Sequence, residues 1–262
     1  MKKKIGLALG SGGARGIAHI GVIRELLKLG IDIDMVSGSS AGALVGGMYA
    51  AGIKIEKIEE MISSLDYTDF WKMLDPVWGA GLVKGKKMME FLDKYLDGIK
   101  IESLNVPFCA VATNIKTADK VVLDKGELVL AIRASSSIPL IFEPFEINGI
   151  TLVDGGLSSP VPVLELQKMG ADVVIAVNLD AIYFLNKNIN RDEGVNTLSV
   201  LTNSYNILRY HLAKMETRDA DIVLEPSIEY VSDFDFAHID SYIKSGEEVV
   251  MKNKERILNL IG

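Results

Sequence analysis

The sequence predicts an α/β fold, a three-layer sandwich in which helices cover a mainly parallel central sheet. Short apolar runs alternate along the chain with longer segments whose apolar residues recur at helical spacing. Because a strand–helix–strand order joins strands that point the same way, this alternation favours a parallel sheet. The chain has 262 residues, of which 48% are hydrophobic, so it can bury a large core. No segment resembles a linker, and we predict one domain over residues 1–262.

The first quarter of the chain predicts two strand–helix units and a further helix. The two strands are short apolar runs, each followed by glycines, and the helices have one apolar face or consist of small residues. In chain order these elements are strand Lys4–Leu9, helix Ile17–Leu29, strand Asp34–Gly38, helix Ser40–Ala51 and helix Lys54–Ser64.

The middle of the chain predicts a loop followed by mixed elements. Asp66–Lys87 carries aromatic residues among prolines and glycines without a clean period, so we expect a loop there. The elements expected after it are helix Lys86–Leu96, strands Val106–Thr113 and Lys120–Leu123, helix Glu127–Ser135 and a hairpin over Phe145–Val153 that turns at Asn148-Gly149.

The last third of the sequence predicts a strand and further helices that belong to the same domain. Pro160–Met169 is expected to be a helix and Asp172–Leu179 a buried strand. A polar segment, Asn186–Gly194, then precedes two helices over 194–218 and 238–260.

The composition and the longest apolar run disfavour several classes of protein. A formal net charge of −7 disfavours a nucleic-acid partner, and the single cysteine, Cys109, excludes an intrachain disulfide. The longest apolar run, about Ala41 to Ile53, is shorter than the ~20 residues of a membrane span. The lysines at the start lead into too short an apolar stretch for a signal peptide. We expect a cytoplasmic protein with at most transient, peripheral membrane contact; the sequence leaves homo-oligomerisation open.

The segment Gly38-Ser39-Ser40-Ala41-Gly42 is a G-x-S-x-G motif between a predicted strand and a predicted helix. Glycines on both sides of the serine allow the sharp turn of a nucleophile elbow, which exposes the hydroxyl of Ser40. The backbone amides and the positive end of the following helix favour negative charge on a bound carbonyl group. The alternative is a strand-to-helix turn in which small residues merely allow close packing.

The glycine-rich segment Gly10–Gly16 follows the first predicted strand and has competing interpretations. Its sixth residue is Arg15, where a dinucleotide fingerprint needs glycine, and it lacks the lysine of a phosphate-binding P-loop. Asp32 and Asp34 stand where a ribose-binding acid could lie, so dinucleotide binding stays open.

The second interpretation makes this segment an oxyanion hole. Gly12 and Gly13 would leave two unobstructed amides that bind the negative charge of a reaction intermediate. Arg15 could anchor the loop, pair with a lipid phosphate or be a surface or structural cation.

Asp154-Gly155-Gly156 follows an apolar run and is either a base on a flexible turn or a simple Asp-Gly turn. The three histidines are His19, His211 and His238. None follows a strand in the late loop where an α/β-hydrolase histidine stands. If Ser40 is a nucleophile, a carboxylate such as Asp154 is therefore the economical base.

These motifs together resemble the patatin-like phospholipase family. Gly12–Gly16 is similar to its oxyanion block, Gly38–Gly42 to its nucleophile elbow and Asp154–Gly156 to its base block. Ala134–Pro139 is similar to the block that precedes the aspartate, and all four occur in family order within residues 5–163. Ser135, Ser136 and Ser137 are expected to line the site. The resemblance implies a patatin-like fold and acyl-ester hydrolysis on lipids.

The resemblance further implies a Ser40–Asp154 dyad that uses neither a metal nor another cofactor. The substrate would be a lipid or phospholipid acyl ester, and the Gly12 and Gly13 amides, helped by that of Ala41, would hold the oxyanion. The supporting residues would be Gly10, Arg15, Gly16, Gly38, Gly42, Gly155 and Gly156. Two other classes remain open, a nucleotide-binding protein that uses Gly10–Gly16 and a non-catalytic adaptor that retains the fold.

Overall fold

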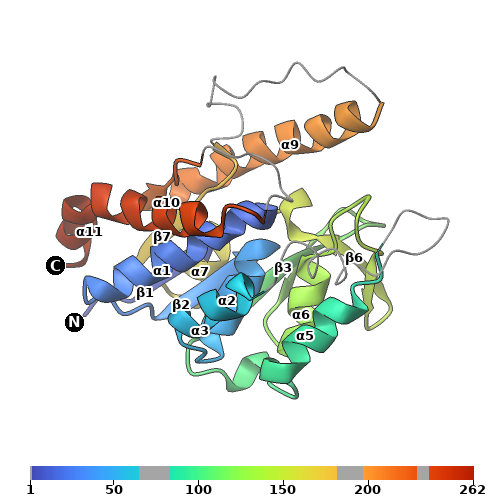
Figure 1. Ribbon diagram of the computed structural model, residues 1–262, viewed down its shortest axis with the longest axis horizontal. Coiled ribbons are helices and arrows are strands. Elements are labelled where there is room, and N and C mark those ends of the chain that lie inside the picture. The colour runs from blue at the N-terminus through green and yellow to red at the C-terminus, as the bar shows by residue number, and fades with distance from the viewer. Residues whose placement is uncertain (1, 65–82, 182–196, 229–235) are drawn as a thin grey trace.

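The computed structural model describes residues 2–64, 83–181, 197–228 and 236–262 (Figure 1). It confirms the α/β class, with helices flanking a central, mainly parallel sheet. The described helices are α1 (Ala18–Lys28), α2 (Ala41–Ala50), α3 (Ile55–Ser63), α5 (Lys86–Leu96), α6 (Leu128–Ser135), α7 (Val163–Met169), α9 (Thr197–Glu216), α10 (Ile239–Lys252) and α11 (Lys254–Ile261). Short 3₁₀ turns cover Gly13–Ile17, Ile101–Ser103, Gly155–Leu157 and Thr217–Asp219.

All eight described strands belong to one sheet, ordered β5-β6-β3-β2-β1-β7-β8, with β4 paired to β3. Their bounds are β1 Ile5–Leu9, β2 Met35–Ser39, β3 Phe108–Asn114, β4 Lys120–Leu123, β5 Phe145–Ile147, β6 Ile150–Asp154, β7 Val173–Val177 and β8 Ile222–Leu224. β1, β2, β3, β7 and β8 run parallel, whereas β3 pairs antiparallel with β4 and β6. The carboxyl ends of the parallel strands therefore meet at one edge, where ligands of open α/β sheets bind.

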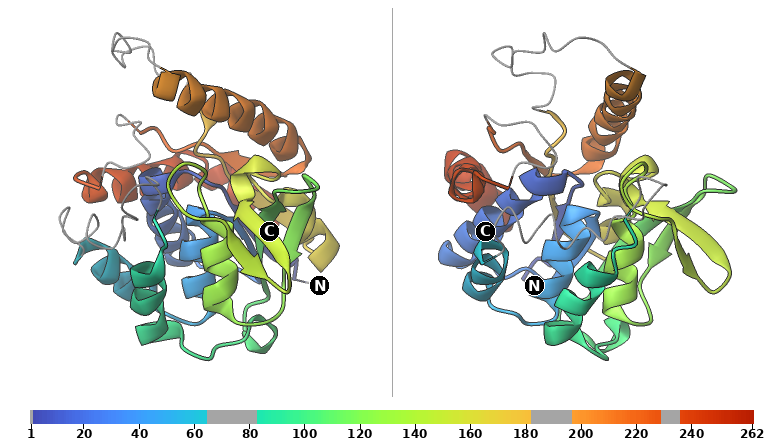
Figure 2. Two further views of the ribbon diagram at one scale, coloured as in Figure 1. Left: turned by 90° about the vertical axis from the view of Figure 1, so that its right-hand side faces the viewer. Right: turned by 45° about the vertical axis from the view of Figure 1, so that its right-hand side comes forward.

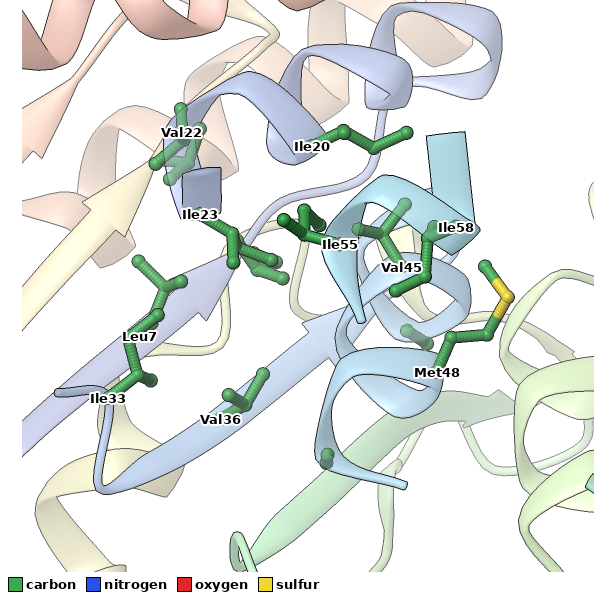
Figure 3. Packing of buried hydrophobic residues seen from close by; sticks show 14 of the residues in the cluster. Leu7, Ile20, Val22, Ile23, Ile33, Val36, Val45, Met48, Ile55 and Ile58 are labelled. Carbon is green, nitrogen blue, oxygen red and sulfur yellow. The ribbon is translucent and has the colours of Figure 1, made fainter. Parts of the chain in front are cut away.

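Alternate side chains of the central strands face two different helical layers. In β1, Leu7 and Leu9 join the large cluster that contains α1, α2, α3 and α10 (Figure 3). Ala8, between them, joins a smaller cluster with Leu166 of α7 and Ala213 of α9. Helices on both faces explain why β1, β2 and β7 are buried at every position rather than at every second one. The views in Figure 2 separate α9 from α10, which contact opposite faces.

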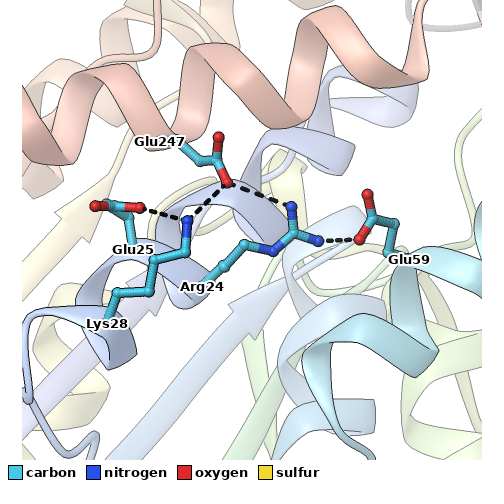
Figure 4. Close-up of polar contacts among 5 residues, drawn as sticks. All are labelled: Arg24, Glu25, Lys28, Glu59 and Glu247. Carbon is cyan, nitrogen blue, oxygen red and sulfur yellow. Dashed lines mark hydrogen bonds and ion pairs between the residues drawn. The ribbon is translucent and has the colours of Figure 1, made fainter.

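The contact between α1 and α10 depends on a glycine and on a set of ion pairs. A Cβ on Gly21 would lie 1.9 Å from the carbonyl oxygen of Ile243, so only glycine permits this approach. On the outer side, the Arg24 guanidinium pairs with Glu59 of α3 and, at 3.3 Å, with Glu247 of α10 (Figure 4). These contacts join α10 and α3 to α1.

Two features differ from the sequence-based expectations. The single helix expected over 238–260 is two helices, because the chain breaks at Asn253, whose side chain donates to the carbonyl of Val249 at 2.8 Å. The short strand β8 was not expected.

Most of the aromatic segment Asp66–Lys87 and all of Asn186–Gly194 lie outside the described residues. Across the described ranges, no helix combines the length and apolar character needed to cross a bilayer.

Candidate active site

Ser40 occupies the sharp turn between β2 and α2. Its backbone has φ 54° and ψ −119°, a left-handed conformation that is strained for a residue with a side chain. The turn is compact: a Cβ on Gly38 would lie 2.5 Å from the carbonyl oxygen of Gly42, and one on Gly42 would lie 2.0 Å from that of Leu9. Both positions therefore require glycine, because any side chain would collide with a backbone carbonyl group. The serine between them has the sharp turn of a nucleophile elbow.

A second serine fixes the backbone of this turn. The Ser40 amide donates to the Ser135 hydroxyl at 2.9 Å, and that hydroxyl donates to the carbonyl of Val111 at 2.6 Å. Ser135 ends α6 and is fully buried. It therefore ties the elbow to β3 and supports the turn that carries Ser40.

The register of β3 brings Asp154 to the elbow. Val111 and Ala112 pair with β4 across one edge of β3, so their remaining partners lie on the other edge. On that edge Ser39, the end of β2, lies opposite Val111. Asp154, the end of β6, lies opposite Ala112, the next residue. β2 and β6 therefore run toward each other along this edge of β3, and their last residues lie next to each other. Ser40 directly follows the last residue of β2.

Backbone and side-chain contacts hold Asp154 in place. Its amide donates to the carbonyl of Ser137 at 3.0 Å, and its carbonyl accepts from the Thr113 hydroxyl at 2.9 Å. Its carboxylate Oδ1 accepts from the Gly156 amide at 2.7 Å. A Cβ on Gly155 would lie 2.1 Å from a β3 carbonyl oxygen and 2.5 Å from the Ser39 hydroxyl. The two glycines therefore let this turn press against β2 and β3, and Asp154 is only 1% exposed.

The glycine loop, Gly10–Gly16, contacts the start of α2 directly after Ser40. Gly13 has φ 56°, which favours glycine, and a Cβ on Gly16 would lie 2.2 Å from that of Ala41. Gly10 is held between strands, since its amide donates to β7. His19 Nε2 lies 2.8 Å from the Gly10 carbonyl oxygen, and burial lowers the pKa of His19 to about 4. The imidazole is therefore neutral near pH 7 and donates to this carbonyl.

The amides of Gly12 and Ala41 belong to the glycine loop and to the first turn of α2. In the part of the chain that the structure describes, the Gly12 amide donates to no protein acceptor. Ala41 begins α2, and the first amides of a helix lack partners within the helix. Backbone amides of this kind can donate to an oxygen that carries negative charge.

Arg15 anchors the glycine loop from within. Its side chain has no exposed surface; Nη1 donates to the carbonyl of Leu179 at 2.8 Å, and Nη2 lies 3.6 Å from Asp180 Oδ1. A surface position for this cation is thereby excluded. The segment after β7 thus fixes the loop after β1.

The acids considered for a dinucleotide ribose lie elsewhere. Asp34 Oδ2 accepts from the amide of Ile5 at 2.7 Å, at the start of β1, and Asp32 pairs with Lys2. The glycine loop follows the opposite end of β1. This separation removes the feature that had kept dinucleotide binding open. Among the described residues, no group of three or more histidine, cysteine or acidic side chains is arranged to hold a metal ion.

A buried arginine that sequence reasoning missed supports the strand end at Asp154. Arg133 Nη1 donates to the Ser137 hydroxyl at 2.8 Å, and Nη2 donates to the carbonyls of Lys84 and Glu143 at 2.8 and 3.1 Å. Burial lowers the pKa of Arg133 to about 10. Its place just before the Ala134–Pro139 block was the available signal, but an arginine in a helix is usually a surface residue.

A second missed residue, Glu216, holds the chain that follows the Asp-Gly-Gly turn. Its carboxylate accepts from the Ser159 hydroxyl at 2.5 Å and from the Val161 amide at 2.9 Å. Burial raises the pKa of Glu216 to about 7, against the lowering effect of these two hydrogen bonds. The folded protein therefore holds a proton on Glu216 between about pH 4.5 and 7 that the unfolded chain releases.

The contribution of Glu216 to stability is thus complete below pH 4.5 and is lost as the pH rises through 7. Glu216→Gln cannot ionise, so we expect it to exceed the wild type in stability by roughly 3 kcal/mol at pH 8 and to match it near pH 4.5. Urea unfolding at both pH values measures the difference. The exposed Glu248→Gln is the control, and equal pH dependence of the two variants would contradict the assignment.

Comparisons with known proteins identify chains that are similar to this one. Residues 7–166 match the family model described as patatin-like phospholipase. An uncharacterized NTE family protein of Mycobacterium bovis is 40% identical over 178 residues, which are 68% of this chain and 49% of that protein. Lysophospholipase NTE1 of Candida glabrata is 34% identical over 187 residues, which are 68% of this chain and 10% of that protein. The chain thus spans half or less of the length of these relatives.

A solved structure extends the comparison to the later helices. The crystal structure of VipD from Legionella pneumophila matches with a TM-score of 0.52 and covers 96% of this chain and 66% of that one. The sequence identity is 14%, so the likeness concerns the fold alone.

Proposed function

The chain belongs to the patatin-like phospholipase family, and from this membership and the geometry at Ser40 we propose that it is a serine lipid acyl hydrolase with a Ser40–Asp154 dyad. One observation supports the proposal most strongly: Ser39 and Asp154 end two strands opposite consecutive residues of β3, so the backbone at Asp154 lies next to the strand end that leads into Ser40. The strained backbone of Ser40 supports a nucleophilic role, because such strain persists where a site requires it.

In the proposed first step, the Ser40 hydroxyl oxygen attacks the ester carbonyl carbon while the Asp154 carboxylate takes its proton. The carbonyl oxygen becomes an oxyanion, held by the amides of Gly12 and Gly13 and by that of Ala41. The carbon–oxygen bond to the leaving group then breaks, and Asp154 returns the proton to the departing alkoxide. An acyl-Ser40 ester remains.

In the second step, water attacks the acyl-Ser40 carbonyl and gives a proton to Asp154. Collapse of this intermediate breaks the bond to Ser40, whose oxygen recovers the proton, and a fatty acid leaves. The step needs one carboxylate and the same oxyanion amides, and neither a metal nor another cofactor enters it.

The proposed substrates are acyl esters of lipids, including phospholipids and lysophospholipids. The matched relatives named lysophospholipase support the lipid class. We also propose that residues 1–262 act as one domain, in the cytoplasm and with transient contact to a membrane surface.

Release of fatty acid from a lipid panel tests the proposal. The panel contains lysophosphatidylcholine, phosphatidylcholine, phosphatidylethanolamine and a triacylglycerol, and the control is Ser40→Ala. We expect release from at least one of these lipids, with a rate in Ser40→Ala lower by about 10⁶-fold, as when a serine nucleophile is removed. A folded wild-type chain that hydrolyses none of them, or equal rates in both proteins, would favour the non-catalytic adaptor.

A further inference from the structure

Helix α9 lies beyond residues 7–166 that match the family model, yet one of its faces reaches the candidate active site. Asn206, Arg209 and Ala213 of this face are buried, and Ala213 packs against the sheet with α7. Tyr205, next to Asn206, is half-buried with its hydroxyl shielded from solvent. Helix α9 therefore adds side chains to a site that is otherwise built from the first two thirds of the chain.

The Tyr205 hydroxyl lies in the immediate surroundings of the Asp154 carboxylate. A Cβ placed on Gly156 would lie 2.9 Å from Asp154 Oδ1, 3.0 Å from the Ser11 hydroxyl and 3.1 Å from the Tyr205 hydroxyl. The three oxygens thus surround one point at the Asp-Gly-Gly turn. Glycine at position 156 is what lets them approach it.

Charged side chains fix the ring of Tyr205 in this place. The Arg209 guanidinium carbon lies 5.2 Å from the ring centroid, and Arg209 pairs with Asp180 Oδ1 at 2.8 Å. Asp180 in turn lies 3.6 Å from Arg15 of the glycine loop. The ion pairs therefore connect the helix that carries Tyr205 with the proposed oxyanion loop.

The hydroxyl of Tyr205 is a proton donor. Among the described residues, none accepts a hydrogen bond from it. Burial raises the pKa of Tyr205, and the nearby Asp154 carboxylate raises it further, whereas Arg209 acts in the opposite direction. The phenol therefore keeps its proton at neutral pH, and a carboxylate is the strongest acceptor near it.

We propose that Tyr205 is a positioning residue of the active site, whose hydroxyl donates a hydrogen bond to the Asp154 carboxylate and holds it toward Ser40. The inference rests on the proposed dyad and adds to it a residue from outside the segment that matches the family. Asp154 already accepts from the Gly156 amide, so a second donor would restrict rotation of the carboxylate as well as stabilise its charge.

The hydrogen bond has a signature in the pH profile. A donor to the carboxylate favours its ionised form and so lowers its pKa. The base must be ionised to act, so kcat/KM falls as the pH drops through that pKa. Removal of the phenolic hydroxyl raises the pKa, and the acid limb of the profile then moves to higher pH. A purely structural role for Tyr205 would not move this limb.

The test measures p-nitrophenyl butyrate hydrolysis from pH 4.5 to 8 by the wild type, Tyr205→Phe and Tyr210→Phe. Phenylalanine keeps the ring over Arg209 and so preserves the packing. Tyr210, on the same helix, is five residues away, about 140° around the axis, and stacks edge-on with His211. Thermal unfolding of all three proteins checks that they fold alike.

We expect Tyr205→Phe to lower kcat roughly 10- to 30-fold with KM nearly unchanged, and to shift the acid limb upward by about one pH unit. Tyr210→Phe should match the wild type. An active wild type with an unshifted acid limb in Tyr205→Phe would overturn the inference, whatever the change in rate. A wild type that hydrolyses neither this ester nor any lipid of the panel would instead overturn the proposed function.

Discussion

Asp154→Asn is expected to lower kcat/KM for ester hydrolysis by about 10²- to 10⁴-fold, the usual contribution of a general base. The amide cannot take the proton of Ser40 in acylation or that of water in deacylation. Its oxygen can still accept from the Gly156 amide, which Asp154 Oδ1 now binds at 2.7 Å, so the turn should keep its shape. Initial rates with p-nitrophenyl butyrate at pH 7.5 measure the effect.

Asp172→Asn is the matched control for this variant. The Asp172 carboxylate also accepts from a backbone amide, that of Lys4 at 2.8 Å, but it precedes β7 at the opposite end of the sheet. Its rate should equal that of the wild type. If both variants lost activity alike, the loss would come from the fold rather than from a missing base, and Asp154 would have no place in the reaction.

Gly42→Ala is expected to destabilise the protein by at least about 3 kcal/mol and to abolish activity. The added methyl group would lie 2.0 Å from the Leu9 carbonyl oxygen and 2.8 Å from that of Gly10. Neither contact can relax without moving β1 or the start of α2. Because the elbow and the glycine loop meet here, such a shift would also displace Ser40. Urea unfolding followed by circular dichroism measures the loss.

Gly47→Ala, in the same helix, separates this steric effect from helix propensity. Its methyl group would lie 2.9 Å from the Cδ1 atom of Ile132, the flexible end of a side chain. Alanine is favoured over glycine inside a helix by about 1 kcal/mol, so the net change should stay within about 1 kcal/mol of zero. Similar destabilisation in both variants would show that close packing at Gly42 is not the reason for its glycine.

Local signals in the sequence predicted most of the fold. The apolar runs that became β1, β2, β3 and β7 are flanked by glycines or turn residues, and the hairpin turn at Asn148-Gly149 has a strong local preference. β8 was missed because it has only three residues, Ile222–Leu224, and is a strand only by pairing with β7. The helix break at Asn253 was missed because neither glycine nor proline marks it; in the folded chain the Asn253 side chain donates to the carbonyl of Val249.

The candidate site was predictable where its residues lie in compact motifs. Ser40, Asp154 and the glycine loop each stand in a short segment with its own backbone requirements, which the sequence displays. Arg133 and Tyr205 carry no such mark, and Ser135, although it stands in the Ala134–Pro139 block, was expected only to line the site. Their roles depend on which strand end or carboxylate each meets, and β3, α6 and α9 set those contacts only in the folded chain.

The role of His19 also could not be predicted from the sequence. The position of the histidines along the chain indicated that none serves as the base, but it could not assign His19 a place. In the structure its ring contacts the Gly10 carbonyl at 2.8 Å, so this histidine supports the loop as a neutral donor. A buried polar side chain is understood only once its partner is known.

Active-site labelling with a fluorophosphonate tests most directly whether Asp154 activates Ser40. The reagent is incubated with the wild type, Ser40→Ala and Asp154→Asn, and the modified peptide is identified by mass spectrometry. We predict one adduct, on Ser40, that is absent in Ser40→Ala and forms at least 100-fold more slowly in Asp154→Asn, roughly the lower bound for losing a general base. An adduct on another residue, or equal labelling rates in the wild type and Asp154→Asn, would contradict the account.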